Sequence, residues 1–158
     1  IDIKKDDDDS KAINNIANLY REEKNYDKAI EYYRLASNQD PSNSMYMNNL
    51  ADTLRLNGEL DHALEVLQDS LKLNSEGMGT YFNLGMVYKD LKENEKALNS
   101  FEKSLQVNSS LTEAYYQIAQ IHLTIKNRDL ALKFIDKAIE SSPNNLIYQG
   151  SREKILAL

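Results

Sequence analysis

Residues 78–111 read MGTYFNLGMVYKDLKENEKALNSFEKSLQVNSSL, and this stretch decides the fold. Its first half places apolar or small residues at i, i+3, i+4 and i+7, the spacing of one helix face: Tyr81, Leu84, Gly85 and Tyr88. Its second half repeats that spacing at Ala97, Phe101 and Ser104. Between them the polar pair Glu93 and Asn94 lets the chain reverse. The stretch therefore predicts two helices that face each other.

The same pattern returns with a period of 34 residues, as the alanines Ala29, Ala63, Ala97 and Ala131 show. Further columns are apolar or small in nearly every copy: Ile13, Met47, Tyr81, Tyr115; Ile16, Leu50, Leu84, Ile118; Ala17, Ala51, Gly85, Ala119; Tyr20, Leu54, Tyr88, His122; Tyr33, Leu67, Phe101, Ile135; and Ala36, Ser70, Ser104, Ala138. We expect an all-helical chain with helices near 10–23, 26–38, 44–57, 60–73, 78–91, 94–107, 112–125, 128–141 and 145–158.

The columns resemble the tetratricopeptide repeat, because residue sizes from Tyr81 to Ser104 fall where that family has them. The likeness covers nearly the whole chain. Departures are Ile13 and Met47 in place of the first aromatic residue, and Ser75 and Ser109 in place of the closing proline. The resemblance implies an all-α fold, a right-handed α-solenoid of antiparallel helix pairs, with repeats at 10–43, 44–77, 78–111 and 112–145.

The second helix of each pair opens with a carboxylate, which can cap free amides and oppose the helix dipole: Asp27, Asp61, Glu95 or Asp129. Short polar turns precede these helices at Lys24 and Asn25, Asn57 and Gly58, Glu93 and Asn94, and Lys126 and Asn127.

The two ends of the chain depart from the repeat. Residues 1–9 form an acidic tail or the remnant of an earlier repeat, and 146–158 form a capping or truncated helix. In that helix Gln149, Arg152 and Glu153 fall in columns that are apolar or small elsewhere. Tyr148, Ile155 and Leu158 would cover the last repeat, or would join copies of the chain into a homo-oligomer.

Composition limits the partners and the compartment. The 158 residues are 41% hydrophobic and 28% charged, contain no cysteine and carry a net charge of -6. An acidic surface repels phosphate, so no nucleic-acid partner is expected. No apolar run is long enough for a membrane span. Cytoplasm is the expected location, and periplasm stays open.

No residue set indicates an enzyme, a metal site or a cofactor. His122 takes a core-column position and is expected to pack, whereas His62 lies on a second helix and is expected to be exposed. No histidine spacing suits a metal. The sequence has no phosphate-binding glycine loop or nucleophile motif, and the acidic run Asp6 to Asp9 lacks the pattern of a calcium loop.

In the tetratricopeptide family the first helix of each repeat lines a concave groove, so the resemblance places the candidate site there. The columns beside the core stripe are Asn15, Asn49, Asn83, Gln117; Asn14, Asn48, Phe82, Tyr116; Asn18, Asp52, Met86, Gln120; and Arg21, Arg55, Lys89, Leu123. The first is a ladder of amides that can bond the main chain of an extended peptide. It resembles the asparagine ladder in the repeat arm of O-linked N-acetylglucosamine transferase.

Each of these columns also has a purely structural interpretation. The amides could satisfy neighbouring groups, and Phe82 and Tyr116 could be partly buried rather than serve as apolar anchors. The basic residues Arg21, Arg55 and Lys89 could attract an acidic segment or pair with Glu22 and Asp90. Family members that clamp a chaperone's terminal carboxylate use basic residues at places that hold Asn14, Gly79 and Asn83 here, so that specificity is not expected.

We therefore expect a non-catalytic module that binds a protein or peptide in its groove. Two alternatives remain open at this level. The chain could be the targeting arm of a larger enzyme, such as a glycosyltransferase, an interpretation favoured by a first residue that is Ile1 rather than Met. It could also be a structural scaffold that assembles with itself.

Overall fold

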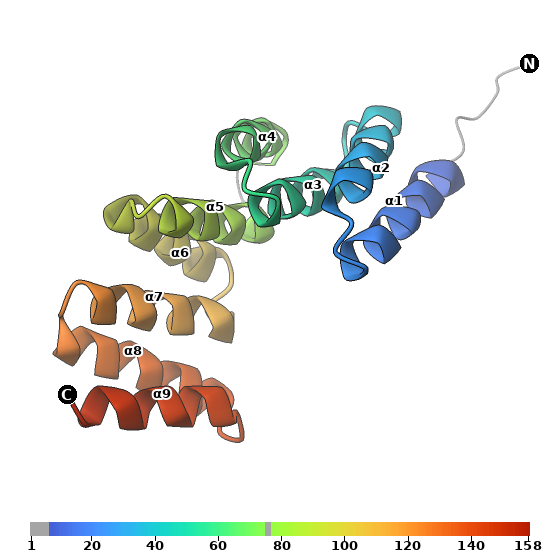
Figure 1. Ribbon diagram of the computed structural model, residues 1–158. Coiled ribbons are helices and arrows are strands. Elements are labelled where there is room, and N and C mark those ends of the chain that lie inside the picture. Colours follow the sequence, from blue (N-terminus) through green and yellow to red (C-terminus); the bar gives the residue numbers. More distant parts are fainter. Residues whose placement is uncertain (1–6, 75–76) are drawn as a thin grey trace, which may run out of the picture. The chain divides into compact units, whose positions relative to one another are not determined.

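The computed structural model describes residues 7–74 and 77–158, and within these ranges the protein is helical without strands. The helices are α1 (Asp7–Glu22), α2 (Tyr26–Gln39), α3 (Ser44–Leu56), α4 (Leu60–Leu73), α5 (Met78–Asp90), α6 (Asn94–Val107), α7 (Thr112–Thr124), α8 (Arg128–Ser141) and α9 (Leu146–Leu156) (Figure 1). Each expected helix is present with ends within one turn of the predicted ones. The predicted all-α fold of paired helices is confirmed.

The largest difference in helix bounds lies at the start of α1. This helix begins at Asp7, so it includes residues that the sequence had assigned to an acidic tail. A carboxylate in the first helical turn, such as that of Asp9, opposes the positive end of the helix dipole, which favours this earlier start. Residues 1–6 of the predicted tail lie outside the described residues.

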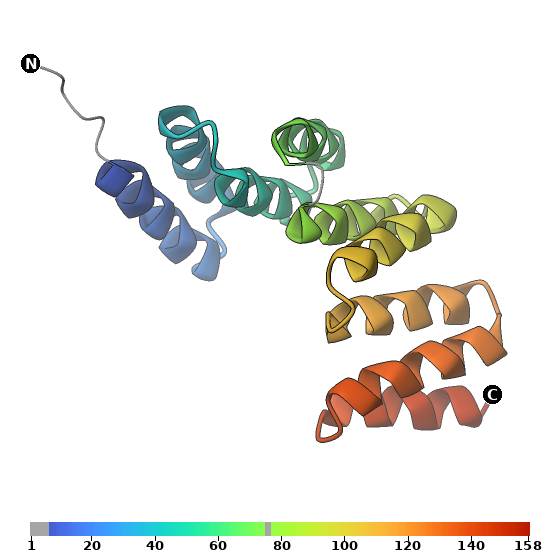
Figure 2. The same ribbon diagram turned by 180° about the vertical axis from the view of Figure 1, so that it is seen from behind.

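The chain forms two compact units, and the division falls inside α5. The first unit ends at Asn83 and the second begins at Leu84. In the first unit α1 packs against α2, α2 against α3, and α3 against α4. In the second unit the sequence of contacts is α6 with α7, α7 with α8, and α8 with α9. Figures 1 and 2 show these neighbours side by side from opposite directions.

The predicted core columns of the second helices are buried in every repeat. The column of large residues, Tyr33, Leu67, Phe101 and Ile135, is 0% exposed throughout. The same is true of the small residues Ala29, Ala63, Ala97 and Ala131, and of Ala36, Ser70, Ser104 and Ala138. Large and small positions thus alternate through the core, which lets the paired helices approach closely.

At each step from one repeat to the next, two buried residues lie ten positions apart, and two of the four pairs combine alanine with tyrosine. Ala36 is followed by Tyr46, Ser70 by Thr80, Ser104 by Ala114, and Ala138 by Tyr148, all of them buried. At the second junction the Oγ atoms of Ser70 and Thr80 lie 3.1 Å apart. Thr80 also donates to Oδ1 of Asn48 over 2.9 Å.

The first copy of the packing face is less covered than the later copies. Ile16 is 40% exposed, whereas Leu50, Leu84 and Ile118 of its column are at most 6% exposed. Leu19 is 61% exposed, whereas Thr53, Val87, Ile121 and Ile155 in its column are at most 1% exposed. In the described residues no helix pair precedes α1, so the prediction that Ile16 is a core residue is wrong for this copy.

Asparagines, rather than the predicted carboxylates, provide the side-chain caps of α2 and α8. Asn25 accepts from the amide of Lys28, and Asn127 accepts from that of Leu130. The equivalent Glu59 and Glu93 make no side-chain cap bond. The four predicted carboxylates lie one position inside the first turn, so their contribution is to oppose the helix dipole.

The short turns before these helices share one backbone feature, a residue with positive φ. Gly58 has φ of 84°, as befits a residue without a Cβ. Lys24, Lys92 and Lys126 adopt the same left-handed region, with φ of 59°, 61° and 61°.

The last helix covers the end of the second unit. Tyr148 is 6% exposed and Ile155 is 0% exposed, and both join a core cluster with Ala119, Ala131, Ile135 and Ala138. The polar residue Arg152 lies outside this cluster and donates to Asp136 over 2.6 Å. Of the three residues predicted to cover the repeat or to join copies, Leu158 alone stays exposed, at 79%. Self-association through this helix therefore stays a prediction.

Candidate functional site

The predicted groove residues lie on the first helices of the repeats, and the two units hold separate parts of the set. In the first unit Asn14 is buried and Asn15 is exposed, while the others are half-buried: Asn18, Arg21, Asn48, Asn49, Asp52, Arg55, Phe82 and Asn83. In the second unit Gln117 is buried and Met86, Lys89, Tyr116, Gln120 and Leu123 are half-buried.

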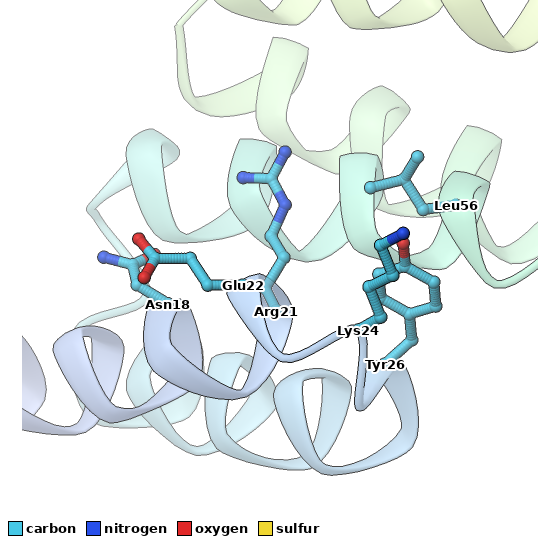
Figure 3. A pocket seen from close by; sticks show the side chains of 6 residues that line it. All are labelled: Asn18, Arg21, Glu22, Lys24, Tyr26 and Leu56. Carbon is cyan, nitrogen blue, oxygen red and sulfur yellow. The ribbon is translucent and has the colours of Figure 1, made fainter.

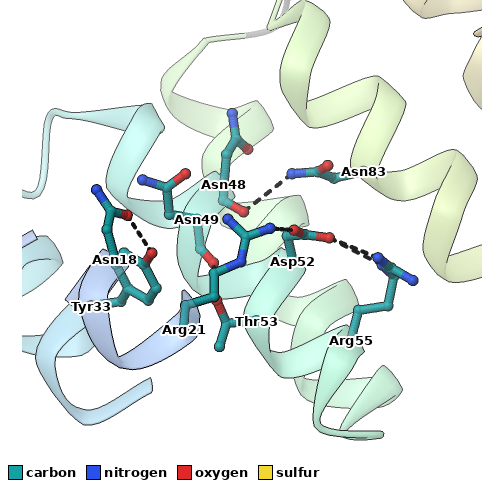
Figure 4. Close-up of polar contacts among 9 residues, drawn as sticks. All are labelled: Asn18, Arg21, Tyr33, Asn48, Asn49, Asp52, Thr53, Arg55 and Asn83. Atoms are coloured by element: carbon teal, nitrogen blue, oxygen red, sulfur yellow. Dashed lines mark hydrogen bonds and ion pairs between the residues drawn. The ribbon is translucent and has the colours of Figure 1, made fainter. Parts of the chain in front are cut away.

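The amide column of the first unit joins neighbouring first helices. The Nδ2 atom of Asn49 on α3 donates to Oδ1 of Asn14 on α1 over 3.1 Å. In the same way Nδ2 of Asn83 on α5 donates to the main-chain oxygen of Asn48 on α3 over 3.1 Å (Figure 4). Both bonds use the nitrogen of the amide. The Oδ1 atoms of Asn49 and Asn83 accept no hydrogen bond within the described residues and remain acceptors.

The equivalent amide of the second unit is more fully engaged. Nε2 of Gln117 donates to Glu113 over 2.7 Å, and its Oε1 accepts a bond from Lys89. Gln117 is 7% exposed. Both ends of this amide therefore have partners, which corresponds to the structural interpretation of the column.

Two arginines of the first unit share one carboxylate. Arg21 on α1 binds Oδ2 of Asp52 on α3, and Nη2 of Arg55 lies 3.0 Å from Oδ1 of the same residue (Figure 4). The side chains of Arg21, Asp52 and Arg55 are 35%, 18% and 14% exposed. Two members of the predicted basic column, Arg21 and Arg55, therefore pair with Asp52 of the adjacent column, whereas Lys89 donates to Gln117 in the second unit.

Asn18 is held by the core of its own repeat. The phenol of Tyr33 on α2 donates to Oδ1 of Asn18 on α1 over 2.5 Å. Burial raises the pKa of Tyr33 above its ordinary value of 10.0, while the neighbouring Arg21 acts in the opposite direction. A protonated phenol is the form that can donate, so this bond fixes the Asn18 carbonyl towards Tyr33 and leaves the Asn18 amino group as a donor.

The two predicted aromatic anchors lie in different units. Phe82 is half-buried in the first unit. Tyr116 is half-buried in the second, where its ring centroid lies 5.0 Å from that of Tyr148. One side of Tyr116 is therefore used for packing within its own unit.

A pocket of about 320 Å³ opens beside the first part of the candidate groove. Asn18, Arg21 and Glu22 line it from α1, Lys24 and Tyr26 from the turn and the start of α2, and Leu56 from the end of α3. Figure 3 shows Arg21, Lys24 and Tyr26 extending towards α3, with Glu22 turned towards Asn18.

Four of these pocket residues, Glu22, Lys24, Tyr26 and Leu56, were not among the predicted groove residues. They lie in a turn or at helix ends, where the groove columns assigned from first helices do not reach. Glu113 was also missed, although it accepts from both Gln117 and Tyr148. Its position four residues before Gln117 on α7 was the available signal.

The histidines occupy the places expected from the sequence. His122 is 8% exposed and its ring stacks on that of Phe134, with centroids 5.6 Å apart. Its Nδ1 atom is buried and has no hydrogen-bond partner among the described residues. His62 has a side chain that is 60% exposed and lies 2.9 Å from Glu59.

The described residues contain neither a cluster of metal-ligating side chains nor a helix suited to spanning a membrane. In the ranges 7–74 and 77–158, no group of three or more potential metal-ligating side chains is placed to hold an ion. Across the same part of the chain, no helix combines the length and apolar character that crossing a membrane requires.

Comparison with known protein families gives matches over nearly the whole chain. Models described as tetratricopeptide repeat match residues 8–76, 80–111 and 112–145. Members of this family are generally non-catalytic interaction modules. A comparison with curated protein sequences finds no match.

Several solved structures share the fold. MamA is 20% identical with a TM-score of 0.73, over 94% of this chain and 86% of that one. YrrB is 22% identical with a TM-score of 0.75, over 91% and 74%. Pseudomonas aeruginosa pilF is 19% identical with a TM-score of 0.86, over 96% and 69%. At these identities the likeness concerns the fold alone.

Proposed function

This chain belongs to the tetratricopeptide repeat family, and we propose that it is a non-catalytic module that binds an extended peptide segment of a partner protein. The bound segment lies along the first helices of the first unit, over α1, α3 and the start of α5. One similar structure, YrrB, is a tetratricopeptide protein with an unusual peptide-binding site, which supports this class of ligand.

The observation that carries the proposal is the fixed orientation of two amides. Asn49 and Asn83 each use Nδ2 for a bond inside the protein and retain Oδ1 as an acceptor. An extended peptide has main-chain N–H groups that need such acceptors, whatever its sequence. Because the amides are already held, little side-chain freedom is lost when they bind.

The half-buried ring of Phe82 adds an apolar contact next to Asn83. Aromatic side chains contribute large contact areas with few rotatable bonds, which is why they dominate many interfaces. We place the main-chain bonds at the amides and the side-chain selectivity at this ring.

The first test uses a library of random peptides and the variant Asn49→Ala with Asn83→Ala. Each amide-to-backbone bond contributes about 0.5–1.5 kcal/mol net, so the pair should weaken selected peptides about tenfold or more. Phe82→Ala should weaken them comparably. Dissociation constants can be measured by calorimetry, with unfolding curves to confirm that each variant is folded.

A matched control replaces two exposed amides on second helices of the same unit, Asn38→Ala with Gln68→Ala. This variant should bind as the unchanged protein does. Peptides that bind all three groove variants normally, but lose affinity on changes at Glu31, Arg34 or Glu65 of α2 and α4, would refute the proposed surface.

A further inference from the structure

The pocket beside α1 and α3 has a lining of hydrogen-bond donors, and we propose that it holds the carboxylate of an acidic side chain in the bound peptide. The inference rests on the proposed function, because the peptide on the first helices presents this side chain. It assigns a ligand class to a cavity formed by Asn18, Arg21, Glu22, Lys24, Tyr26 and Leu56.

The donors follow from the hydrogen bonds that the lining residues already make. Asn18 uses its carbonyl to accept from Tyr33, so its amino group is the part left for a ligand. Arg21 gives Nη2 to Asp52 and has further N–H groups. In the described part of the chain, Lys24 makes no ion pair and the Tyr26 hydroxyl makes no hydrogen bond. Four residues with hydrogen-bond donors available to a ligand therefore line one cavity.

The charges of the lining favour an anion. Arg21 and Lys24 are cationic and Glu22 is anionic, which gives the lining a net positive charge within a chain of net charge -6. Glu22 turns towards Asn18, away from Lys24 and Tyr26 (Figure 3). Asp52 neutralises part of the positive charge of Arg21. This carboxylate is also shared with Arg55, and it does not line the pocket.

Arg21 and the backbone of the turn that carries Lys24 are held in place before any ligand arrives. Arg21 is tied to Asp52 across α1 and α3. The turn that carries Lys24 is closed by main-chain bonds from Lys24 to Arg21 over 3.0 Å and from Asn25 to Tyr20 over 2.8 Å. Because Arg21 and the turn backbone are already constrained, less entropy is lost when the site binds a carboxylate. Charge-assisted bonds of this kind are also among the stronger ones in proteins.

The experiment selects binders from a random peptide library with acetylated N termini and amidated C termini, so that side chains supply the only carboxylates. Peptides recovered with the unchanged protein should share Asp or Glu at one fixed position. Replacing that residue by Asn or Gln should weaken binding about tenfold, as expected for the loss of a charge-assisted bond. In Lys24→Met and in Tyr26→Phe this difference should shrink to about twofold.

Lys126→Met is the matched control, because Lys126 occupies the equivalent left-handed turn position in the second unit. It should leave the acidic preference intact. Two outcomes would overturn the pocket assignment and leave the proposed function standing. In the first, the recovered peptides depend on Asn49 and Asn83 but share no acidic position. In the second, they share an acidic position, but Lys24→Met does not change its effect on binding. A library that yields no binder would overturn both. Resynthesis with free C termini tests the other carboxylate source, and binding gained only there would also overturn the assignment.

Discussion

At Gly85 the ring of Phe101 occupies the space that a Cβ would need. A Cβ built on Gly85 would lie 2.6 Å from Cε1, 2.7 Å from Cδ1 and 2.8 Å from Cζ of that ring. The same column holds alanine in the other repeats, at Ala17, Ala51 and Ala119. The third repeat thus uses the smallest residue on one helix to admit an aromatic ring from the other.

Gly85→Ala should therefore lower the free energy of unfolding. Overpacking against Phe101 costs about 1–3 kcal/mol, and the better helix propensity of alanine offsets about 1 kcal/mol of that cost. Adding Phe101→Leu should recover much of the loss, since the second repeat pairs Ala51 with Leu67 in these columns. Denaturant unfolding of the two single variants and the double variant gives the coupling energy.

Gly150→Ala is the control for this experiment, because a Cβ on Gly150 has nothing within 4 Å. This substitution lies inside α9 and should raise stability by about 0.5–1 kcal/mol. If Gly85→Ala stabilised the protein as Gly150→Ala does, the assigned contact with Phe101 would be wrong.

His122 should make stability depend on pH. Burial lowers the pKa of His122 below its ordinary value of 6.5, while the charge of Glu102 acts in the opposite direction. A histidine with a lowered folded-state pKa is protonated first in the unfolded chain. The free energy of unfolding should therefore be highest above about pH 6.5 and should fall as the pH drops below that value.

This dependence can be isolated by comparing unfolding curves of His122→Leu and His62→Gln with those of the unchanged protein over that pH range. Leucine is the residue of the same column in the second repeat, at Leu54. His122→Leu should flatten the pH dependence, and His62→Gln, at an exposed position, should preserve it. Equal slopes in the two variants would contradict the role given to His122.

At the scale of the element, the buried phenol of Tyr148 links α9 to α7 by a hydrogen bond. The Tyr148 hydroxyl donates to Oε2 of Glu113 over 2.9 Å. Burial, followed by the bond to Glu113 and the charges of Glu113 and Tyr116, raises the pKa of Tyr148 to about 12. The hydroxyl therefore keeps its proton, and its bond, over the whole neutral range.

Tyr148→Phe should lower the free energy of unfolding of the second unit by about 1.5–3 kcal/mol at neutral pH, as expected for a bond to a charged group. The unchanged protein should keep this contribution below about pH 10 and lose it as the pH rises towards about 12. Denaturant unfolding measured at both ends of that interval provides the check. The variant should lose less stability than the unchanged protein over the interval, and an equal loss would count against the bond.

At the scale of the whole chain, the features that could be predicted from the sequence were those that recur in every repeat. Every copy of the Tyr33, Leu67, Phe101 and Ile135 column is buried as expected, because a period of 34 residues brings each to the same place between helices. The helix bounds followed for the same reason. The prediction that Ile16 is buried was wrong, because the repeat pattern describes a helix with neighbouring repeats on both sides. α1 has a described neighbour on one side only.

The candidate site was predicted less completely than the fold. The columns identified Asn49, Asn83 and Arg21, but not the partners that orient them, because Asn14, Asn48 and Asp52 bind across repeats rather than along a column. Such bonds depend on the few ångströms by which neighbouring helices are offset. The pocket residues Lys24 and Leu56 could not be found from a helical pattern, since they lie where helices end.

The buried pairs at the junctions bear on whether similar repeats of one chain pack in the correct order. Tandem repeats can misfold when one repeat packs against another that is not its neighbour in the chain. The junctions at Ala36 and Tyr46 and at Ala138 and Tyr148 combine alanine with tyrosine, whereas the Oγ atoms of Ser70 and Thr80 lie 3.1 Å apart. If the first repeat packed directly on the third, Ala36 would lie against Thr80. The Thr80 hydroxyl would then lose its partner Ser70, and a buried polar group without that hydrogen bond destabilises the packing. The polar junction of Ser70 and Thr80 thus disfavours direct packing of the first repeat on the third.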